Sequence, residues 1–172
     1  MYEFAADPPV EECIGDLLRE RGETVAVVEG ATGGMVAALL TSVPGASDYV
    51  DRALVPYDYD ALRDRLAVPR ETLDEHGAVS EPTVRATARA ARDTADATWG
   101  LATAGVAGPG GGTPATPVGT GFVGVAHAAP WGSGESRVVV ERYAFDGDRA
   151  AIRERLARQA LADLAGAVDG RT

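Results

Sequence analysis

The sequence predicts one α/β domain built on a mixed, mostly parallel sheet with helices on both faces. Its 172 residues are the length of a single domain, and 45% of them are hydrophobic, enough for a sizeable core. Short apolar runs alternate with segments that repeat apolar residues at helical spacing, as in sheets covered by helices. Late in the chain, two apolar runs flank a glycine-rich loop, which adds a strand–loop–strand unit and makes the sheet mixed.

The first half of the chain is divided by its periodicity and by its glycine and proline residues. It predicts an acidic arm over 1–9, an amphipathic helix over 10–20, a buried strand over 24–28, a small-residue helix over 35–40, a strand over 52–57, a helix over 59–66 and a helical turn after Pro69. Arg21-Gly22 ends the first helix, and Gly30 with Gly33-Gly34 separates the first strand from the second helix.

The second half follows the same logic. It predicts a helix over 81–97, a strand over 99–106, a loop over 108–114, a strand over 119–128, a strand nearer an edge over 137–145, and a last helix that ends near 168. Ser80-Glu81-Pro82 begins the helix over 81–97, which lies on the sheet through an alanine-rich face. Asp146-Gly147-Asp148 begins the last helix. We therefore expect one domain over 10–168, followed by a short tail over 169–172.

Charge and cysteine usage restrict the classes of function. All 16 basic residues are arginine, so the chain has no lysine, and 26 acidic residues give a formal charge of −10, which disfavours nucleic-acid binding. Such an acidic composition is typical of proteins from the salt-rich cytosol of halophiles, where counterions screen the repulsion between like charges. An alanine- and arginine-rich protein encoded by GC-rich DNA would have a similar composition. Cys13 is the only cysteine and there are two histidines, so we expect no disulfide, no metal and no cofactor. No segment predicts a signal peptide or a membrane span, so we expect a cytoplasmic protein.

The glycine-rich loop is the most informative local feature. Its central residues are Gly108, Gly110, Gly111, Gly112 and Thr113. Consecutive backbone N–H groups without bulky side chains can form an anion-binding concavity, as they do around phosphates. Composition alone equally allows a tightly turned connection.

The chain resembles a known family through this loop and several other strings. These strings are Gly105-Val106-Ala107-Gly108-Pro109-Gly110-Gly111-Gly112-Thr113-Pro114, Pro117-Val118-Gly119-Thr120, Thr32-Gly33-Gly34, Leu40-Thr41-Ser42-Val43-Pro44-Gly45-Ala46-Ser47-Asp48-Tyr49, His76-Gly77-Ala78-Val79-Ser80-Glu81, Phe145-Asp146-Gly147-Asp148-Arg149 and Ile152-Arg153. Together they resemble the signature of the CinA C-terminal domain family, which includes nicotinamide mononucleotide deamidases. The resemblance covers about residues 11–167 in order. It implies a homodimer or larger oligomer that, in active members, hydrolyses the carboxamide of nicotinamide mononucleotide to a carboxylate and ammonia.

The residues that would carry this chemistry are altered. The resemblance implies a serine nucleophile activated by a lysine, with backbone N–H groups holding the oxyanion. The serine position corresponds to Gly30, next to the retained Glu29, and the lysine position corresponds to Leu62. Two further polar positions correspond to Tyr59 and Ala104. A different alignment cannot restore the dyad, because the chain has no lysine and arginine is too basic to accept the proton.

Several residues remain candidates for binding a ligand. They are Glu29, Thr32, Tyr57, Gly108, Gly110, Gly111, Gly112, Thr113, Arg149 and Arg153. Arg149 and Arg153 lie four apart on the last helix and either contact a phosphate or carboxylate or pair with neighbouring acids. Thr32 could replace the nucleophile, but a threonine before a helix is typical of an N-cap. Asp58 and Asp60 could activate a water, but adjacent acids on an acidic surface are usually solvated.

Three hypotheses for function stay open at this point. The first is a paralogue that keeps a nucleotide-sized pocket and has lost amidohydrolase activity, and so acts as a binding or regulatory module. The second is an active amidohydrolase in which Thr32 or a water replaces the dyad. The third is a structural subunit of an active paralogue. Tyr59 and Leu62 make one wall of the pocket less polar than in the family, which bears on which ligand fits.

Overall fold

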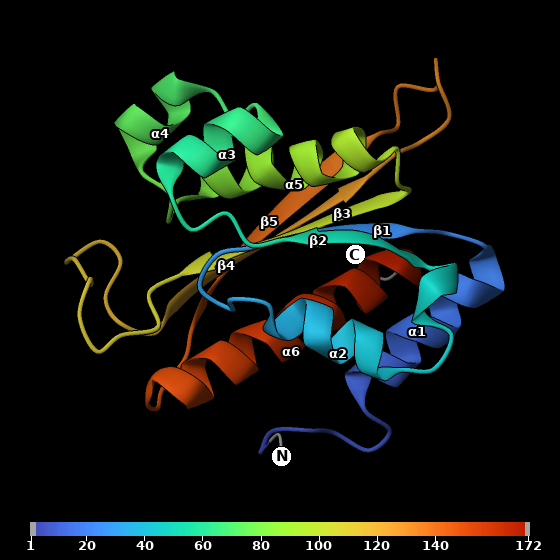
Figure 1. The fold of residues 1–172 in the computed structure, drawn as a ribbon, viewed down its shortest axis with the longest axis horizontal. Coiled ribbons are helices and arrows are strands. Elements are labelled where there is room, and N and C mark those ends of the chain that lie inside the picture. Colours follow the sequence, from blue (N-terminus) through green and yellow to red (C-terminus); the bar gives the residue numbers. More distant parts are fainter. Residues whose placement is uncertain (1–2, 171–172) are drawn as a thin grey trace.

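The computed structural model describes residues 3–170 and places a five-stranded sheet between two layers of helices (Figure 1). Met1 and Tyr2 of the expected arm, and Arg171 and Thr172 of the expected tail, lie outside the described residues. The strands are β1 (Val25–Glu29), β2 (Val50–Leu54), β3 (Trp99–Gly105), β4 (Thr120–His127) and β5 (Arg137–Ala144). The helices are α1 (Val10–Arg21), α2 (Met35–Ser42), α3 (Tyr59–Leu66), α4 (Arg70–His76), α5 (Glu81–Ala95) and α6 (Arg149–Val168), and a short 3₁₀-helix spans Ala46–Asp48.

The sheet has the strand order β2-β1-β3-β4-β5. The strand β1 pairs in parallel with both β2 and β3, whereas β4 is antiparallel to both of its neighbours. Four of the five strands therefore run in one direction, and only β4 opposes them. The sequence prediction of a mixed, mostly parallel sheet is confirmed.

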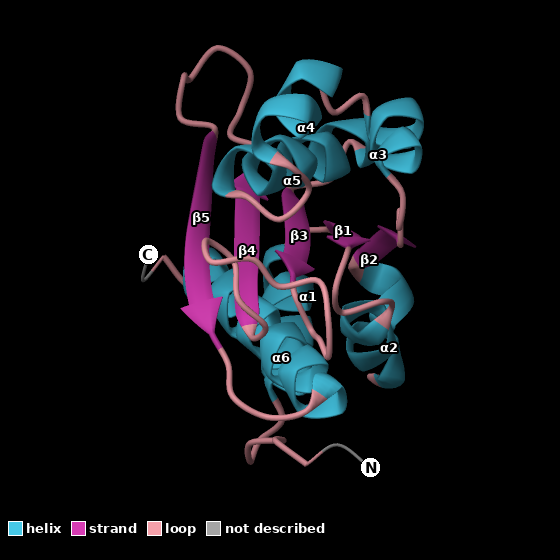
Figure 2. Cartoon of the chain, turned by 90° about the vertical axis from the view of Figure 1, so that its left-hand side faces the viewer, coloured by secondary structure: helices cyan, strands magenta, loops and turns pink. Residues whose placement is uncertain are grey.

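Helices cover both faces of the sheet (Figures 1 and 2). One layer contains α1, α2 and α6, and the other contains α5 with α3 and α4 packed beside it. The helix α5 approaches the sheet closely, because a Cβ on Gly100 of β3 would lie 2.1 Å from the carbonyl oxygen of Ala88. This short separation follows from the alanine-rich face that the sequence predicts for α5.

Two of the differences between the predicted and observed element boundaries have a clear local cause. The strand β2 spans Val50–Leu54 rather than 52–57, since its pairing with β1 starts at Val25 opposite Val50, and Pro56 has no N–H to continue a ladder. The helix α5 ends at Ala95 rather than at residue 97, because Asp96 adopts a left-handed conformation with φ of 50°. None of the helices in residues 3–170 has the length and apolar character needed to cross a membrane.

Candidate functional site

A cavity of about 190 Å³ lies on the α5 side of the sheet, at the carboxyl ends of β1 and β3. Parallel strands end at a common edge, and ligands of open α/β sheets usually bind there. The sheet contributes Val28, Gly30, Ala31, Ala102, Thr103, Ala104 and Gly105 to the lining. The loop after β2, together with α3, contributes Pro56, Tyr57, Asp58, Tyr59 and Leu62. The segment before α5 contributes Ala78 and Val79, and α5 itself contributes Thr83, Val84 and Thr87.

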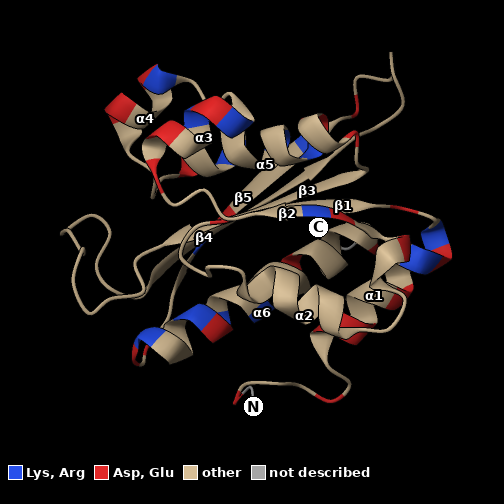
Figure 3. Ribbon diagram, in the orientation of Figure 1, with Lys and Arg blue, Asp and Glu red and all other residues tan. Residues whose placement is uncertain are grey.

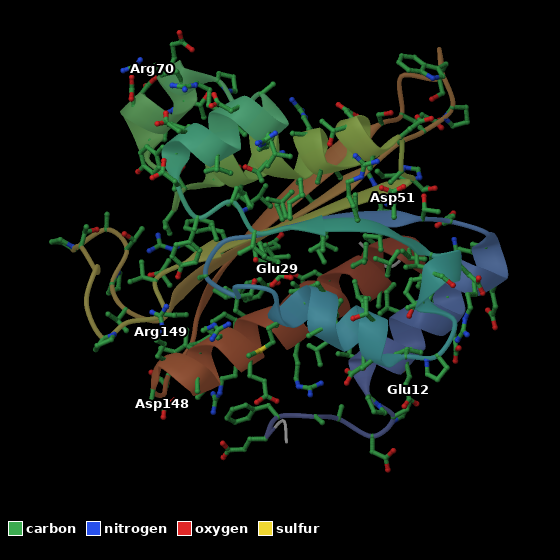
Figure 4. All side chains as sticks on the ribbon, viewed as in Figure 1. Glu12, Glu29, Asp51, Arg70, Asp148 and Arg149 are labelled. Carbon is green, nitrogen blue, oxygen red and sulfur yellow. The ribbon has the colours of Figure 1, made fainter. Side chains whose placement is uncertain are left out.

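Glu29 fixes the turn that begins the cavity wall. Its fully buried carboxylate accepts hydrogen bonds from the backbone N–H groups of Gly34, Val36 and Ala37 at 2.8 to 3.1 Å. Those groups are the free donors at the N-terminus of α2, so Glu29 caps that helix from the end of β1 (labelled in Figure 4). Because the carboxylate points into the α2 layer, the next residue, Gly30, lies on the cavity side.

The four positions at which the family resemblance implies other, polar residues all line this one cavity. Gly30 and Ala104 come from the sheet, and Tyr59 and Leu62 come from α3. The hydroxyl of Tyr59 accepts a hydrogen bond from the N–H of Ala78 at 3.2 Å, so it ties α3 to the segment before α5. Gly30 and Ala104 lie more than 70 residues apart in the sequence, and the fold brings all four positions together.

The polar groups in the cavity are engaged within the protein. Thr83 Oγ1 donates to the carbonyl of Gly77 and Thr87 Oγ1 donates to the carbonyl of Thr83, each at 2.7 Å. Thr103 Oγ1 lies 2.7 Å from Thr32 Oγ1, and Asp58 caps α3 by accepting from the N–H of Asp60. Within residues 3–170, no three His, Cys, Asp or Glu side chains gather as metal ligands would. The lining therefore holds no hydroxyl paired with a base.

Tyr57, Gly108 and Arg149 meet beside the mouth of the cavity. Arg149 Nη1 donates to the carbonyl of Gly108 at 2.6 Å, and Arg149 Nη2 lies 3.2 Å from the Tyr57 hydroxyl. Tyr57 is 71% exposed, so its side chain is accessible to a ligand. Figure 4 places Arg149 at the start of α6, where it contacts Gly108 at the base of the glycine-rich loop. Figure 3 shows that this loop carries no charged residue.

Thr32 and Arg153 lie on the other side of Gly30. Thr32 is fully buried, and its carbonyl accepts from Arg153 Nε at 3.2 Å and Nη2 at 2.7 Å. The prediction that Thr32 is the N-cap of α2 is wrong. Gly33 and Gly34, both with positive φ, separate Thr32 from the helix, and Glu29 supplies the cap instead.

The tip of the glycine-rich loop lies apart from the cavity. Figure 1 shows this loop, which connects β3 to β4, projecting beyond the ends of these strands. Gly110, Gly111, Gly112 and Thr113 are exposed, and the N–H of Thr113 donates to the carbonyl of Thr116 at 3.0 Å. Of the five loop residues expected to bind an anion, the structure brings only Gly108 next to Arg149.

Sequence reasoning missed three threonines that line the cavity. Thr83 and Thr87 lie four apart on α5, so both project from one helix face next to its alanine stripe, and this spacing was a usable signal. Thr103 lies within an apolar strand, where its role depends on contact with Thr32, 71 residues earlier. No local pattern encodes that contact.

Comparison with known proteins identifies the family. The model of the CinA C-terminal domain matches residues 7–168. This chain belongs to the CinA C-terminal domain family. A CinA-like protein of Anaeromyxobacter sp. (strain K) is 49% identical over 144 residues, and a CinA-like protein of Chlorobaculum tepidum is 43% identical over 155 residues. These matches cover 84% and 90% of this chain but only 34% and 36% of the relatives, so the chain spans about a third of their length.

Solved structures agree over almost the whole chain. A competence/damage-inducible protein of Agrobacterium tumefaciens superposes with a TM-score of 0.86 at 34% identity, covering 98% of this chain and 99% of the other. A CinA superfamily protein of Klebsiella pneumoniae superposes with a TM-score of 0.85 at 30% identity, covering 94% and 96%. The expected CinA C-terminal fold is confirmed.

Proposed function

We propose that this chain binds a nucleotide at the cavity and does not hydrolyse the carboxamide of nicotinamide mononucleotide. The observation that carries the proposal is that Gly30 and Leu62, which replace the serine and lysine implied by the family resemblance, line the same cavity. Acyl transfer requires a nucleophile within reach of a base that takes its proton. The cavity has the position for such a pair and lacks both members of it.

The volume of the cavity supports a binding mode in which only the ring of a nucleotide enters it. Its volume of about 190 Å³ is below the roughly 300 Å³ at which pockets for drug-sized ligands begin. It therefore accommodates a ring, while the sugar and phosphate of a nucleotide stay at the mouth. The exposed ring of Tyr57 and the guanidinium of Arg149 lie there, and arginine is well suited to binding phosphate oxygens.

An alternative nucleophile is not supported by the geometry. Thr32 Oγ1 is buried and hydrogen-bonded to another threonine, with no histidine or carboxylate to accept its proton. Asp58 is occupied as the N-cap of α3. A chain that binds the nucleotide without consuming it acts as a regulatory module, alone or together with an active relative.

The first experiment measures binding and turnover in parallel, in molar potassium chloride. We expect calorimetry to detect binding of nicotinamide mononucleotide, and we expect no ammonia release above the enzyme-free rate. The Tyr57→Ala and Arg149→Gln variants should bind at least about tenfold more weakly, because each removes a contact at the mouth. Ammonia release by the unmodified chain, or the absence of any binding, would overturn the proposal.

A variant that restores the serine and lysine tests whether nicotinamide mononucleotide still fits the cavity. The Gly30→Ser/Leu62→Lys variant restores both members of the dyad, and ammonia release by it would show that the substrate still fits. A Cβ at position 30 would lie 3.0 Å from the carbonyl oxygen of Thr103, so the backbone must shift by a few tenths of an ångström. The matched control is Gly30→Ala/Leu62→Lys, which imposes the same crowding without a nucleophile and should stay inactive.

A further inference from the structure

The strand β5 leaves one edge of the sheet unpaired. It is the last strand in the order, so only β4 pairs with it (Figure 2). Its centre reads Val138-Val139-Val140, with no proline, glycine or charge among these three residues. Natural edge strands are usually shortened, bulged or charged at the centre, because an open edge is a template for another strand. The edge at β5 lacks these protections at its centre.

The hydrogen-bond pattern tells which backbone groups are open. The N–H of Phe145 donates to the carbonyl of Gly119 at 2.9 Å, which sets the phase of the antiparallel ladder. Bonded pairs alternate along such a ladder, so odd-numbered residues of β5 bond to β4 and the groups of Val138 and Val140 point to the open edge. In agreement with this phase, the carbonyl of Val138 accepts from Arg85 Nη1 of α5 at 2.7 Å.

The side chains on one face of β5 form a self-complementary row. Arg137, Val139 and Glu141 share the face toward α6, and Val139 is 39% exposed between the two charged residues. Neither Arg137 nor Glu141 forms an ion pair with another of the residues 3–170. Opposite charges placed at equal distances on either side of an apolar residue can meet their counterparts in an identical strand related by a two-fold axis.

We propose that β5 pairs antiparallel with β5 of a second copy of this chain, with the two-fold axis at Val139. In this register Val139 faces the partner's Val139, and Arg137 of each copy faces Glu141 of the other. Val138 and Val140 of opposite copies then exchange backbone hydrogen bonds through the groups that already point outward. The two sheets join into one continuous sheet across the dimer.

Charge disfavours an alternative register that is centred on Glu141. A shift that centres the axis on Glu141 keeps the same faces together but places two carboxylates directly opposite each other, which is unfavourable. The chosen register requires Arg85 to leave the carbonyl of Val138. Arg85 keeps a second partner there, since its Nη2 lies 2.7 Å from Glu81 Oε1 on the same helix.

A cross-linking experiment tests the axis. Facing residues in a non-hydrogen-bonded antiparallel pair have Cα atoms about 4.5 Å apart, within the range of about 4.4 to 6.8 Å for disulfides. In a Cys13→Ser background, we expect Val139→Cys to form a disulfide-linked dimer under mild oxidation. The matched control is Arg137→Cys, whose counterpart in the dimer is Glu141 and not itself. Equal cross-linking of the two variants, or none at position 139, would overturn the register.

A charge-exchange experiment tests the pairing without a covalent bond. Arg137→Glu and Glu141→Arg each create two like-charge pairs in the homodimer, so sedimentation velocity should show at least about a tenfold weaker dimer for each variant. Mixed together, the two variants are complementary at both pairs, and the heterodimer should recover the original affinity. An unmodified chain that stays monomeric at high concentration, or variants whose affinity does not change, would overturn the proposal.

A proline variant tests whether the dimer interface lies at β5 or elsewhere on the molecule. Val140→Pro removes one N–H that points to the open edge and none that bonds to β4, so the monomer should keep its fold by circular dichroism. We expect it to remain monomeric at concentrations at which the unmodified chain is dimeric. A folded Val140→Pro chain that still forms dimers would place the interface away from β5.

Discussion

The two helix layers differ in how completely they pack against the sheet. The layer of α1, α2 and α6 fills its side with large aliphatic residues, and Ile14, Leu18, Leu39, Leu161 and Leu164 are each 0% exposed. The layer of α3, α4 and α5 has two smaller clusters, and the cavity lies between α3, α5 and the strand ends. Close packing throughout one layer stabilises the fold. The other layer can therefore leave a cavity that is open to a ligand.

The largest effect should come from truncating a leucine in the filled layer. Leu161→Ala removes a fully buried side chain from α6, and we expect it to lower the free energy of unfolding by about 4 kcal/mol. The matched substitution Leu62→Ala in α3 should lower the free energy of unfolding by only about 2 kcal/mol, since that side chain already borders a cavity. Urea unfolding of the two variants measures the difference. Equal losses would mean that the two layers are packed alike.

The sequence predicts the ends of most helices better than the position of the edge strand β2. Glycine and helical periodicity place α1 and α6 to within a residue, because Gly22 and Asp148 are local signals at their ends. The start of α3 at Tyr59 is also predicted, and the structure shows that Asp58 caps it. The position of β2 is not, because its ends are set by pairing with β1 rather than by its own residues.

The same reasoning explains the mixed result for the candidate site. Glu29, Tyr57, Arg149 and Arg153 do lie around the turn and the mouth, because the family resemblance carries three-dimensional information that composition lacks. The role of Thr32 was misread because its partner, Thr103, is distant in sequence. The glycine-loop tip was expected at the site because glycines suit anion binding, yet its direction depends on how β3 and β4 end.

We expect an intermediate loss in the free energy of unfolding when Glu29, which joins the end of β1 to the start of α2, is changed. In Glu29→Gln one carboxylate oxygen becomes an NH₂ group that faces a backbone N–H, so at least one of the donors now served by Glu29 loses its acceptor. We expect a loss of about 2 kcal/mol in the free energy of unfolding. Glu12→Gln on the exposed face of α1 is the matched control and should change stability by less than about 0.5 kcal/mol. Similar losses for both variants would remove the capping role from Glu29.

The smallest expected effect is a pH dependence of stability that arises from Glu154, on the side of α6 that faces the N-terminal arm. Burial of the Glu154 carboxyl would by itself raise its pKa, but the N–H groups of Glu3 and Phe4 and the guanidinium of Arg158 together hold the pKa below its usual 4.5. The unfolded chain therefore binds this proton more readily than the folded one. The stability that Glu154 contributes is present above pH 4.5 and is lost as the pH falls through the lower folded pKa.

This dependence can be isolated by comparison with Glu154→Gln, which cannot titrate. Between about pH 6 and pH 3, the stability of the unmodified chain should fall toward that of the variant, so the difference between their urea midpoints should shrink. The arm reports the same event, because Phe4 lies against Arg155, with its ring centroid 4.3 Å from the guanidinium carbon. Proteolysis after Glu3 should accelerate over the same pH range. A constant difference in midpoints would mean that Glu154 acts through packing rather than through its charge.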